Sequence, residues 1–297
     1  MFRGSFTALT TPFKNGQFDR AALEKQIEFQ AKHGTNGIVP VGTTGESPTV
    51  SHEEHHHIFE VAVQAARGTG MKVLAGTGSN ATDEALDLTR FAKKIGADGA
   101  LMVNPYYNKP TQEGMYRHFK AIATAVDIPI VLYNIPGRTG VTMANATVAR
   151  LARECKNIVC MKEATGSLDS CSELCATAPA GFTVLSGDDS MTLPFMSVGA
   201  VGVISVATNI IPKQIRQMVD SALANDFAAA RQIHRRYFEL FKALFLEGNP
   251  MGIKTALALL GRDTGEMRLP LCEVTAGTRN AIKTALFNAG LLEDNRA

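Results

Sequence analysis

A repeating alternation of two residue patterns most strongly limits how this chain can fold. Short runs of apolar and β-branched residues predict strands, and each is followed by a stretch whose apolar residues recur at helical spacing. The unit occurs eight times, with starts about 25 to 35 residues apart. Expected strands lie at 5–12, 37–42, 72–78, 99–105, 129–136, 158–165, 182–189 and 202–209. Expected helices lie at 19–33, 51–66, 81–95, 111–126, 144–154, 168–178, 191–198 and 212–223.

Eight successive βα units predict an α/β protein, a (β/α)8 TIM barrel in which a parallel sheet closes inside a ring of helices. The nearly continuous apolar strands indicate a sheet that is covered on both faces. A doubly wound sheet is the alternative, but it needs a break in the rhythm and usually fewer strands. After residue 225 the pattern becomes wholly helical, so we expect a barrel at 1–225 and a C-terminal helical extension at 226–297.

Composition argues against several classes of partner and location. The 30 basic and 28 acidic residues are well mixed, so no basic stripe indicates nucleic acid, and we expect a small-molecule ligand. No apolar run reaches the roughly 18 residues of a membrane span, and the first residues lack the pattern of a signal peptide. The five cysteines include no C-x-x-C pair and are expected to be small apolar residues in a reducing cytoplasm.

Active sites of such barrels gather where the strands end. Lys162 stands at the end of the sixth predicted strand, where a charged residue is unusual. It closes the apolar run IVCM, although burying an ammonium group is costly. Burial would lower the pKa of the amine and make it a nucleophile for a Schiff base. A structural ion pair with Glu163 is the alternative, although adjacent strand residues point to opposite faces. Both interpretations stay open at this point.

Polar residues at three other strand ends are candidates for the same site. Tyr133 and Arg138 follow the fifth strand in LYNIPGRTG, where a tyrosine can transfer protons and an arginine can bind a carboxylate. The GTTGES loop at 42–47 lets backbone N–H groups approach an anion. In NPYYN the adjacent Tyr106 and Tyr107 must splay apart, so only one of them is expected to face the pocket.

The stretch SHEEHHHIFE contains H-E-x-x-H, the zinc-protease pattern, which raises the alternative of a zinc hydrolase. The pattern begins at a helix end, where Ser51 and Glu54 form the S-x-x-E of a capping box. Zinc proteases need a buried helix and a third ligand, and the sequence suggests none. We therefore favour a solvated helix start for this stretch.

Together, GTTGE, PYYN, YNIPxRTG and the strand-end lysine of MKEAT resemble the class I pyruvate-dependent aldolases, most closely the dihydrodipicolinate synthase family. The resemblance runs from residue 1 to about 292, with the motifs in the right order. It implies a lyase that condenses pyruvate with L-aspartate 4-semialdehyde, the first committed step of diaminopimelate and lysine biosynthesis. It also implies a homotetramer. Because the lysine itself is the electron sink, the resemblance implies neither a cofactor nor a metal.

The resemblance also implies roles for individual residues. Lys162 would form the Schiff base with pyruvate, and Arg138 would hold the carboxylate of the semialdehyde. The proton relay would consist of Tyr133, Thr44 and, from a neighbouring subunit, Tyr107. Other parts of the pocket would be the backbone at Thr43 and Thr44, which would hold the pyruvate carboxylate, and the backbone at Gly187 and Ile204.

Two further alternatives share this fold. Sialic-acid lyases and keto-deoxy sugar-acid aldolases resemble the chain in the lysine, the tyrosine and the glycine-rich loop, but R-T-G after Y-N-x-P is not typical of them. A barrel that binds keto acids without turnover is disfavoured by the complete set of reactive residues. Asn104 departs from the threonine that is more usual in the family, which is expected to reshape the pocket wall.

The resemblance finally implies feedback inhibition by L-lysine at a dimer interface near the histidine-rich helix. The matching positions are Ser47, His52, His55, Asn80, Glu84 and Tyr106. Glu84 would neutralise the ammonium group of the effector, and Pro48 replaces the small residue usual beside Ser47.

Overall fold

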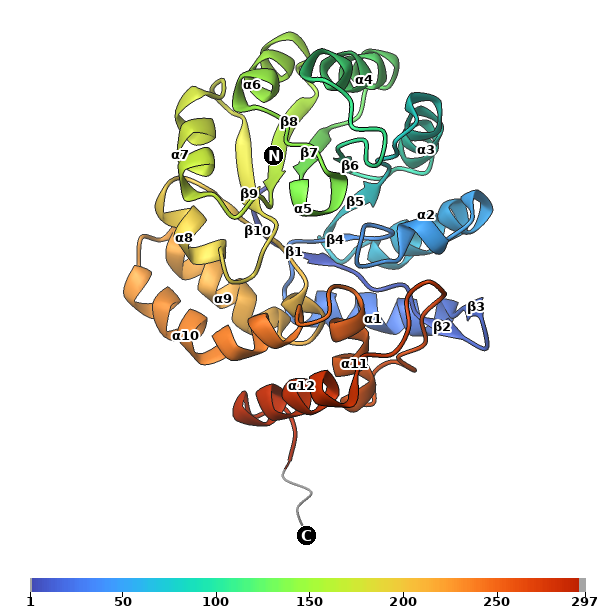
Figure 1. The fold of residues 1–297 in the computed structure, drawn as a ribbon, viewed down its shortest axis with the longest axis vertical. Helices are drawn as coiled ribbons and strands as arrows, with labels where there is room; N and C mark the ends of the chain where they lie inside the picture. The colour runs from blue at the N-terminus through green and yellow to red at the C-terminus, as the bar shows by residue number, and fades with distance from the viewer. Residues whose placement is uncertain (1, 294–297) are drawn as a thin grey trace.

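The computed structural model describes residues 2–293 and confirms the predicted (β/α)8 barrel. Its eight parallel strands close in the order β1-β10-β9-β8-β7-β6-β5-β4, and Figure 1 shows them inside the ring of helices. The barrel strands are β1 Gly4–Ala8, β4 Gly37–Val39, β5 Lys72–Gly76, β6 Gly99–Val103, β7 Ile130–Asn134, β8 Ile158–Glu163, β9 Thr183–Ser186 and β10 Gly202–Ser205.

The helices of the barrel lie where the periodicity predicts them. They are α1 Arg20–Lys32, α2 His52–Ala66, α3 Thr82–Lys94, α4 Gln112–Ala125, α6 Asn145–Glu154, α7 Leu168–Thr177, α8 Thr192–Ser197 and α9 Pro212–Leu223. Side-chain caps fix several starts: the Asp19 carboxylate accepts from Ala22 N at 3.0 Å, and Ser51 and Glu54 form the predicted capping box. The 3-10 turns η1 Ser47–Thr49 and η2 Ala207–Asn209 follow β4 and β10.

A β-hairpin and a single-turn helix were not predicted. The first strand ends at Ala8 rather than at residue 12, and a hairpin of β2 Phe13–Lys14 and β3 Gln17–Phe18 follows. Its turn is Asn15-Gly16, with φ of 53° and 76°, the dipeptide that favours tight hairpin turns. A single helical turn, α5 Pro136–Thr139, follows β7 and carries Arg138.

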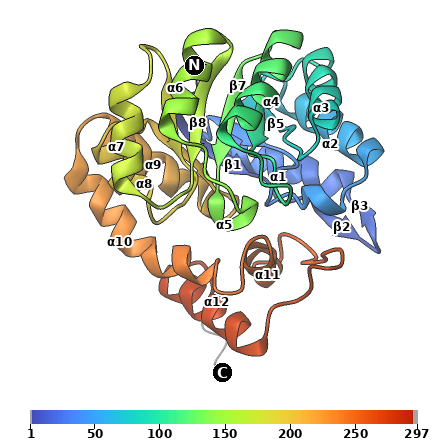
Figure 2. The ribbon, with the colours of Figure 1, turned by 45° about the horizontal axis from the view of Figure 1, so that its top comes forward.

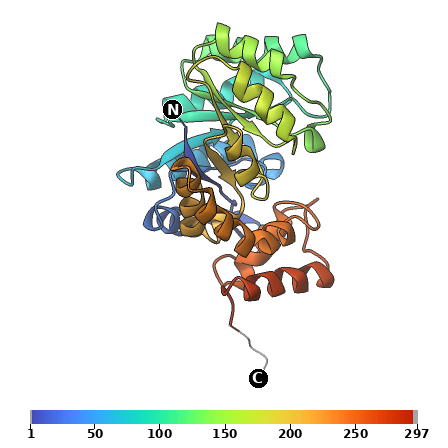
Figure 3. The same cartoon turned by 90° about the vertical axis from the view of Figure 1, so that its left-hand side faces the viewer.

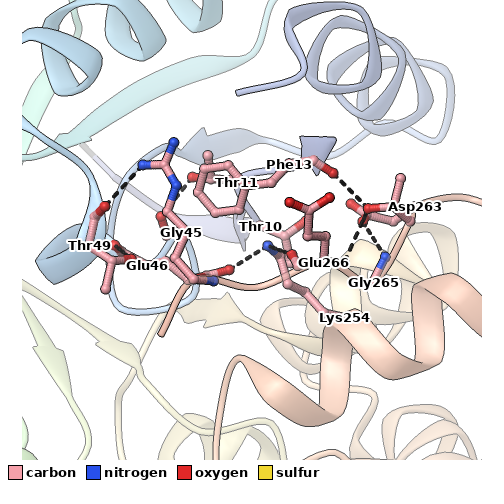
Figure 4. A network of polar contacts seen from close by, with 12 residues as sticks. Thr10, Thr11, Phe13, Gly45, Glu46, Thr49, Lys254, Asp263, Gly265 and Glu266 are labelled. Atoms are coloured by element: carbon pink, nitrogen blue, oxygen red, sulfur yellow. Dashed lines mark hydrogen bonds and ion pairs between the residues drawn. The ribbon is translucent and has the colours of Figure 1, made fainter. Parts of the chain in front are cut away.

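The C-terminal helices α10 Phe227–Ala243, α11 Met251–Leu259 and α12 Ala276–Asn288 pack on one side of the barrel (Figures 2 and 3). A buried ion pair between Lys254 of α11 and Glu46 of the loop after β4 connects this segment to the barrel. Both side chains are 0% exposed, and the Lys254 ammonium also donates to the Glu266 carbonyl at 2.7 Å (Figure 4). The C-terminal segment therefore contacts the 42–47 loop directly.

Arg268 extends this network toward α2. Its backbone N–H donates to Glu46 Oε2 at 3.1 Å, and its guanidinium donates to both oxygens of Glu54 at 2.7 and 2.6 Å. The guanidinium also donates to the Thr49 carbonyl at 3.0 Å and lies 4.2 Å from the centre of the Phe13 ring. Bidentate pairs of this kind are geometrically specific, so the loop, α2 and the C-terminal segment are held in one arrangement.

We predict that Lys254→Met lowers the free energy of unfolding by about 3–5 kcal/mol, because it leaves the Glu46 carboxylate buried without its cation. Lys254→Met combined with Glu46→Gln should recover more than half of the loss, since no buried charge remains. Denaturant unfolding at one fixed protein concentration measures both values. Lys72→Met is the control, because Lys72 pairs with Asp98 on the surface. A loss for Lys254→Met no larger than that of the control would contradict the prediction.

Candidate active site

A cavity of about 250 Å³ opens at the carboxyl ends of the barrel strands. Its walls come from the segments that follow β4, β5, β6 and β7, and Lys162 enters it from the end of β8. The residues that line it and that the sequence singled out are Thr43, Thr44, Ser47, Pro48, Tyr106, Tyr133, Arg138 and Lys162. Residues from separate strand ends therefore meet in one pocket, as barrel geometry predicts.

Lys162 is 6% exposed, and burial lowers the pKa of its amine to about 7. The Arg138 charge lowers this pKa further, whereas the Asp189 carboxylate raises it. The ion pair with Glu163 is absent: among residues 2–293 no carboxylate pairs with Lys162. Instead, Glu163 Oε1 accepts from the backbone N–H of Thr165 at 2.6 Å. The environment thus makes a large fraction of the amine neutral near pH 7.

Tyr133 lies beside Lys162 on the neighbouring strand, with the ammonium 4.0 Å from the centre of its ring. Burial raises the pKa of Tyr133 to about 12, and hydrogen bonding to Thr43 opposes the rise. Thr44 has a different partner, because its Oγ1 accepts from Asn249 Nδ2 at 2.9 Å. The side chain of Thr43 thus acts on Tyr133, whereas the resemblance implies Thr44 for the relay.

Arg138 reaches the cavity from α5, where Nη2 donates to the backbone carbonyl of Asn249 at 2.8 Å. Its positive charge lowers the pKa of both Lys162 and Tyr133, so it affects the two titratable groups at the centre of the pocket. A guanidinium held by one nitrogen keeps donors for an incoming carboxylate.

The two adjacent tyrosines diverge as expected. Tyr106 lines the cavity of its own chain, whereas Tyr107 is 90% exposed and has a φ of 72°. Gly187 lies against the lysine, because a Cβ added there would come within 3.1 Å of Lys162 Cε. Ile204 is fully buried in the cluster of side chains inside the barrel. Among the described residues, neither Gly187 nor Ile204 lines the cavity.

Asn104 lies outside the cavity and is structural. Its Nδ2 donates to Asn134 Oδ1 at 3.0 Å, and the Asn134 side chain in turn binds the backbone N–H and carbonyl of Met143. Asn104 is 0% exposed. The expectation that it reshapes the pocket wall is not supported by this placement.

Sequence reasoning assigned no role to two further residues near the site, Asp189 and Asn249. Asp189 is buried, which raises the pKa of its carboxyl to about 6, and its Oδ2 accepts from the N–H groups of Val206 and Ala207 at 3.1 and 3.0 Å. Asn249 comes from the C-terminal segment and contacts two residues of the pocket. The pair of acids in SGDD was a signal for Asp189, whereas nothing in EGNPMG indicated Asn249.

The start of α2 forms a second polar cluster beside the cavity. His52 Nε2 lies 2.6 Å from Glu84 Oε1, and the Ser79 hydroxyl also contacts Glu84. His55 Nε2 lies 3.4 Å from the Ser47 hydroxyl, and burial lowers the pKa of His55 to about 4. Burial raises the pKa of Tyr106, and the charge of Glu84 adds to this effect. The backbone carbonyl of Asn80 accepts a hydrogen bond from Asn108 at 2.8 Å.

The histidines of H-E-x-x-H have separate acidic partners on α3. His52 pairs with Glu84, and His56 Nε2 lies 3.7 Å from Asp87 Oδ2. Between residues 2 and 293 no three His, Cys, Asp or Glu side chains are grouped so that they could hold a metal ion. Within the same residues no helix has both the length and the apolar character for a membrane span.

Comparisons with known proteins show which family the chain is similar to. The model of the dihydrodipicolinate synthetase family matches residues 1–289. The 4-hydroxy-tetrahydrodipicolinate synthase of Endomicrobium trichonymphae is 52% identical over 293 residues, covering 99% of this chain and 100% of the relative.

Solved structures of other proteins have the same fold as this chain over nearly its whole length. The dihydrodipicolinate synthase of Aquifex aeolicus has a TM-score of 0.97 at 51% identity, covering 99% of this chain and 100% of that one. The lysine-bound enzyme of Cyanidioschyzon merolae has a TM-score of 0.96 at 44% identity, covering 98% and 99%. On the family match, the sequence identity and the site described above, the chain belongs to the dihydrodipicolinate synthetase family.

Proposed function

We propose that the chain is a 4-hydroxy-tetrahydrodipicolinate synthase, a lyase that condenses pyruvate with L-aspartate 4-semialdehyde. The observation that carries the proposal is a buried lysine, Lys162, with a pKa of about 7, in a cavity that also contains Arg138. One group supplies a neutral nucleophile, and the other supplies a cation for a carboxylate substrate.

The chemistry needs no cofactor, because the lysine nitrogen accepts the electrons. The neutral amine of Lys162 attacks the ketone carbon of pyruvate, and water leaves to give a protonated imine. A methyl proton is then lost, which gives an enamine whose carbon attacks the aldehyde carbon of the second substrate. The amine of that substrate attacks the imine carbon, the bond to Lys162 breaks, and the ring closes.

The neighbouring residues would bind substrates and move these protons. The 42–47 loop, with the backbone at Thr43 and Thr44, would hold the pyruvate carboxylate, and Arg138 would hold that of the semialdehyde. Tyr133 would transfer protons together with a threonine hydroxyl. The effect of the Thr43 side chain on the pKa of Tyr133 supports Thr43 as a second candidate for this hydroxyl beside Thr44. Backbone groups at Gly187 and Ile204 would flank the imine.

A homotetramer would complete the site. Tyr107 is the most exposed large aromatic side chain among those described, and in this single chain it lies outside the cavity. This placement supports its proposed role as the relay residue that a neighbouring subunit supplies. The cysteines are all free, and we propose that the enzyme acts in the cytoplasm.

We also propose L-lysine as a feedback effector, bound at the α2 cluster by Ser47, His52, His55, Asn80, Glu84 and Tyr106. The Glu84 carboxylate, 34% exposed at its side chain, would receive the ammonium group of the effector. The polar cluster borders the catalytic cavity, since Ser47 and Tyr106 line both.

We expect pyruvate and borohydride to leave a stable adduct on Lys162, with an initial rate that rises about tenfold from pH 6 to pH 8 and then levels off. The neutral amine is the nucleophile, and with a pKa of about 7 its fraction grows from about a tenth to about nine tenths over this interval. Mass spectrometry locates and counts the adduct. Lys162→Ala should form none, and a rate still rising tenfold per pH unit above pH 8 would show an ordinary lysine.

Arg138→Ala should raise KM for the semialdehyde by about ten- to hundredfold, since it removes a charged donor pair for the carboxylate. Formation of the pyruvate adduct should persist in this variant. Arg150→Ala is the control, because Arg150 pairs with Glu113 and Glu154 on the surface. A coupled assay with both substrates measures KM, and sialic and keto-deoxy sugar acids serve as competing substrates. Turnover of those sugar acids instead of the semialdehyde would overturn the proposed function.

Millimolar L-lysine should inhibit the condensation, and Glu84→Gln should weaken the inhibition by about tenfold, because the variant loses the charge opposite the ammonium group. Asp87→Asn is a matched control, as Asp87 lies on the same helix and faces His56. Initial rates across a lysine titration measure the effect. Full activity of the unmodified protein at millimolar lysine would exclude the effector.

A further inference from the structure

Asn249, on the connection between α10 and α11, touches two residues of the candidate active site. Its side-chain amide donates to Thr44 Oγ1 at 2.9 Å, and its backbone carbonyl accepts from Arg138 Nη2 at 2.8 Å. Asn249 is 6% exposed. Within residues 2–293 its side-chain oxygen has no hydrogen-bond partner, so the contact to Thr44 is the one that its side chain makes.

The direction of this hydrogen bond determines what the Thr44 hydroxyl can do. An amide NH2 group only donates, so Thr44 Oγ1 acts as the acceptor toward Asn249. The single proton of the hydroxyl is then free for another acceptor. Thr44 lines the cavity, and among the described residues no acceptor for its proton is recorded. The Thr44 hydroxyl is therefore prepared to donate to an anionic group in the cavity.

The fold holds Asn249 and Thr44 at this distance from both sides. Five residues after Asn249, Lys254 forms the buried pair with Glu46, which lies two residues after Thr44. The carbonyl of Gly45 accepts from the Thr11 hydroxyl at 2.7 Å. The loop and the C-terminal segment thus form one rigid frame, so that the hydrogen bond is preorganised before a substrate arrives.

We propose that Asn249 is a positioning residue that makes Thr44 a hydrogen-bond donor to the carboxylate of the keto acid. The inference rests on the proposed function, since it assumes that pyruvate binds at the 42–47 loop. It assigns to the C-terminal segment a part in pyruvate affinity. The contact of Asn249 with Arg138 goes through the backbone and is independent of the side chain.

Two variants at position 249 test the direction of the hydrogen bond. Asn249→Asp keeps the shape, and its ionised carboxylate can only accept, so it draws the Thr44 proton away from the cavity and imitates a reversed amide. Asn249→Ala removes the contact and leaves the hydroxyl free to rotate. We expect the pyruvate concentration for half-maximal adduct formation to rise about tenfold or more in Asn249→Asp and about threefold or more in Asn249→Ala.

A double-mutant cycle with Thr44 separates positioning from general structure. In a Thr44→Val background, Asn249→Ala should change pyruvate half-saturation by less than about twofold, because no hydroxyl remains to be oriented. In a Thr44→Ser background, which keeps the hydroxyl, it should have its full effect. Equal effects of Asn249→Ala in the valine and serine backgrounds would mean that Asn249 acts through the fold, and would overturn the proposal.

Adduct formation on Lys162 by the unmodified protein tests the proposed function separately. If that adduct forms while both variants at 249 keep pyruvate half-saturation within about twofold of the unmodified protein, the inference fails and the function stands. Thermal unfolding without pyruvate checks that the variants are folded. If Asn249→Ala does not fold, the nearly isosteric Asn249→Asp alone decides, with an unchanged half-saturation overturning the proposal.

Discussion

The buried pair between Lys254 and Glu46 is the interaction on which the arrangement of the site depends. A carboxylate and an ammonium group that are both removed from water persist only if each satisfies the other. The pair therefore holds the 42–47 loop at one place relative to α11, and Arg268 adds a second constraint on the same carboxylate. A loop rich in glycine and threonine would otherwise have many conformations available to it.

The same pair joins the C-terminal segment to the candidate active site. The division at residue 225 follows the end of the βα rhythm and describes a change of sequence pattern. In the structure, Asn249, Lys254 and Arg268 all contact the loop after β4 or its flanks. The segment after the barrel thus holds the loop after β4 that forms part of the wall of the candidate active site. Its part in function follows from these contacts and is independent of where a domain boundary is drawn.

Sequence periodicity was enough to predict the barrel, because apolar spacing reports directly on which face of each element is buried. Position at a strand end was enough to select Lys162, Tyr133 and Arg138, because barrel geometry brings strand ends together. The different contacts of Thr43 and Thr44 could not be predicted, since they depend on the path of a short loop. Asn249 could not be predicted either, because it meets Thr44 from 205 positions away through one hydrogen bond.

The two buried lysines, Lys162 and Lys254, differ in their charge because their surroundings differ. Burial lowers the pKa of both, but the carboxylate of Glu46 lies against Lys254 and opposes the shift, so that Lys254 is a paired cation. Lys162 has the more distant Asp189 as its compensating charge, and Arg138 adds a positive charge nearby. Its amine is consequently neutral in a large fraction near pH 7. Arg138 thus has two effects at once: it provides a cation for a carboxylate, and it helps to keep the neighbouring amine nucleophilic.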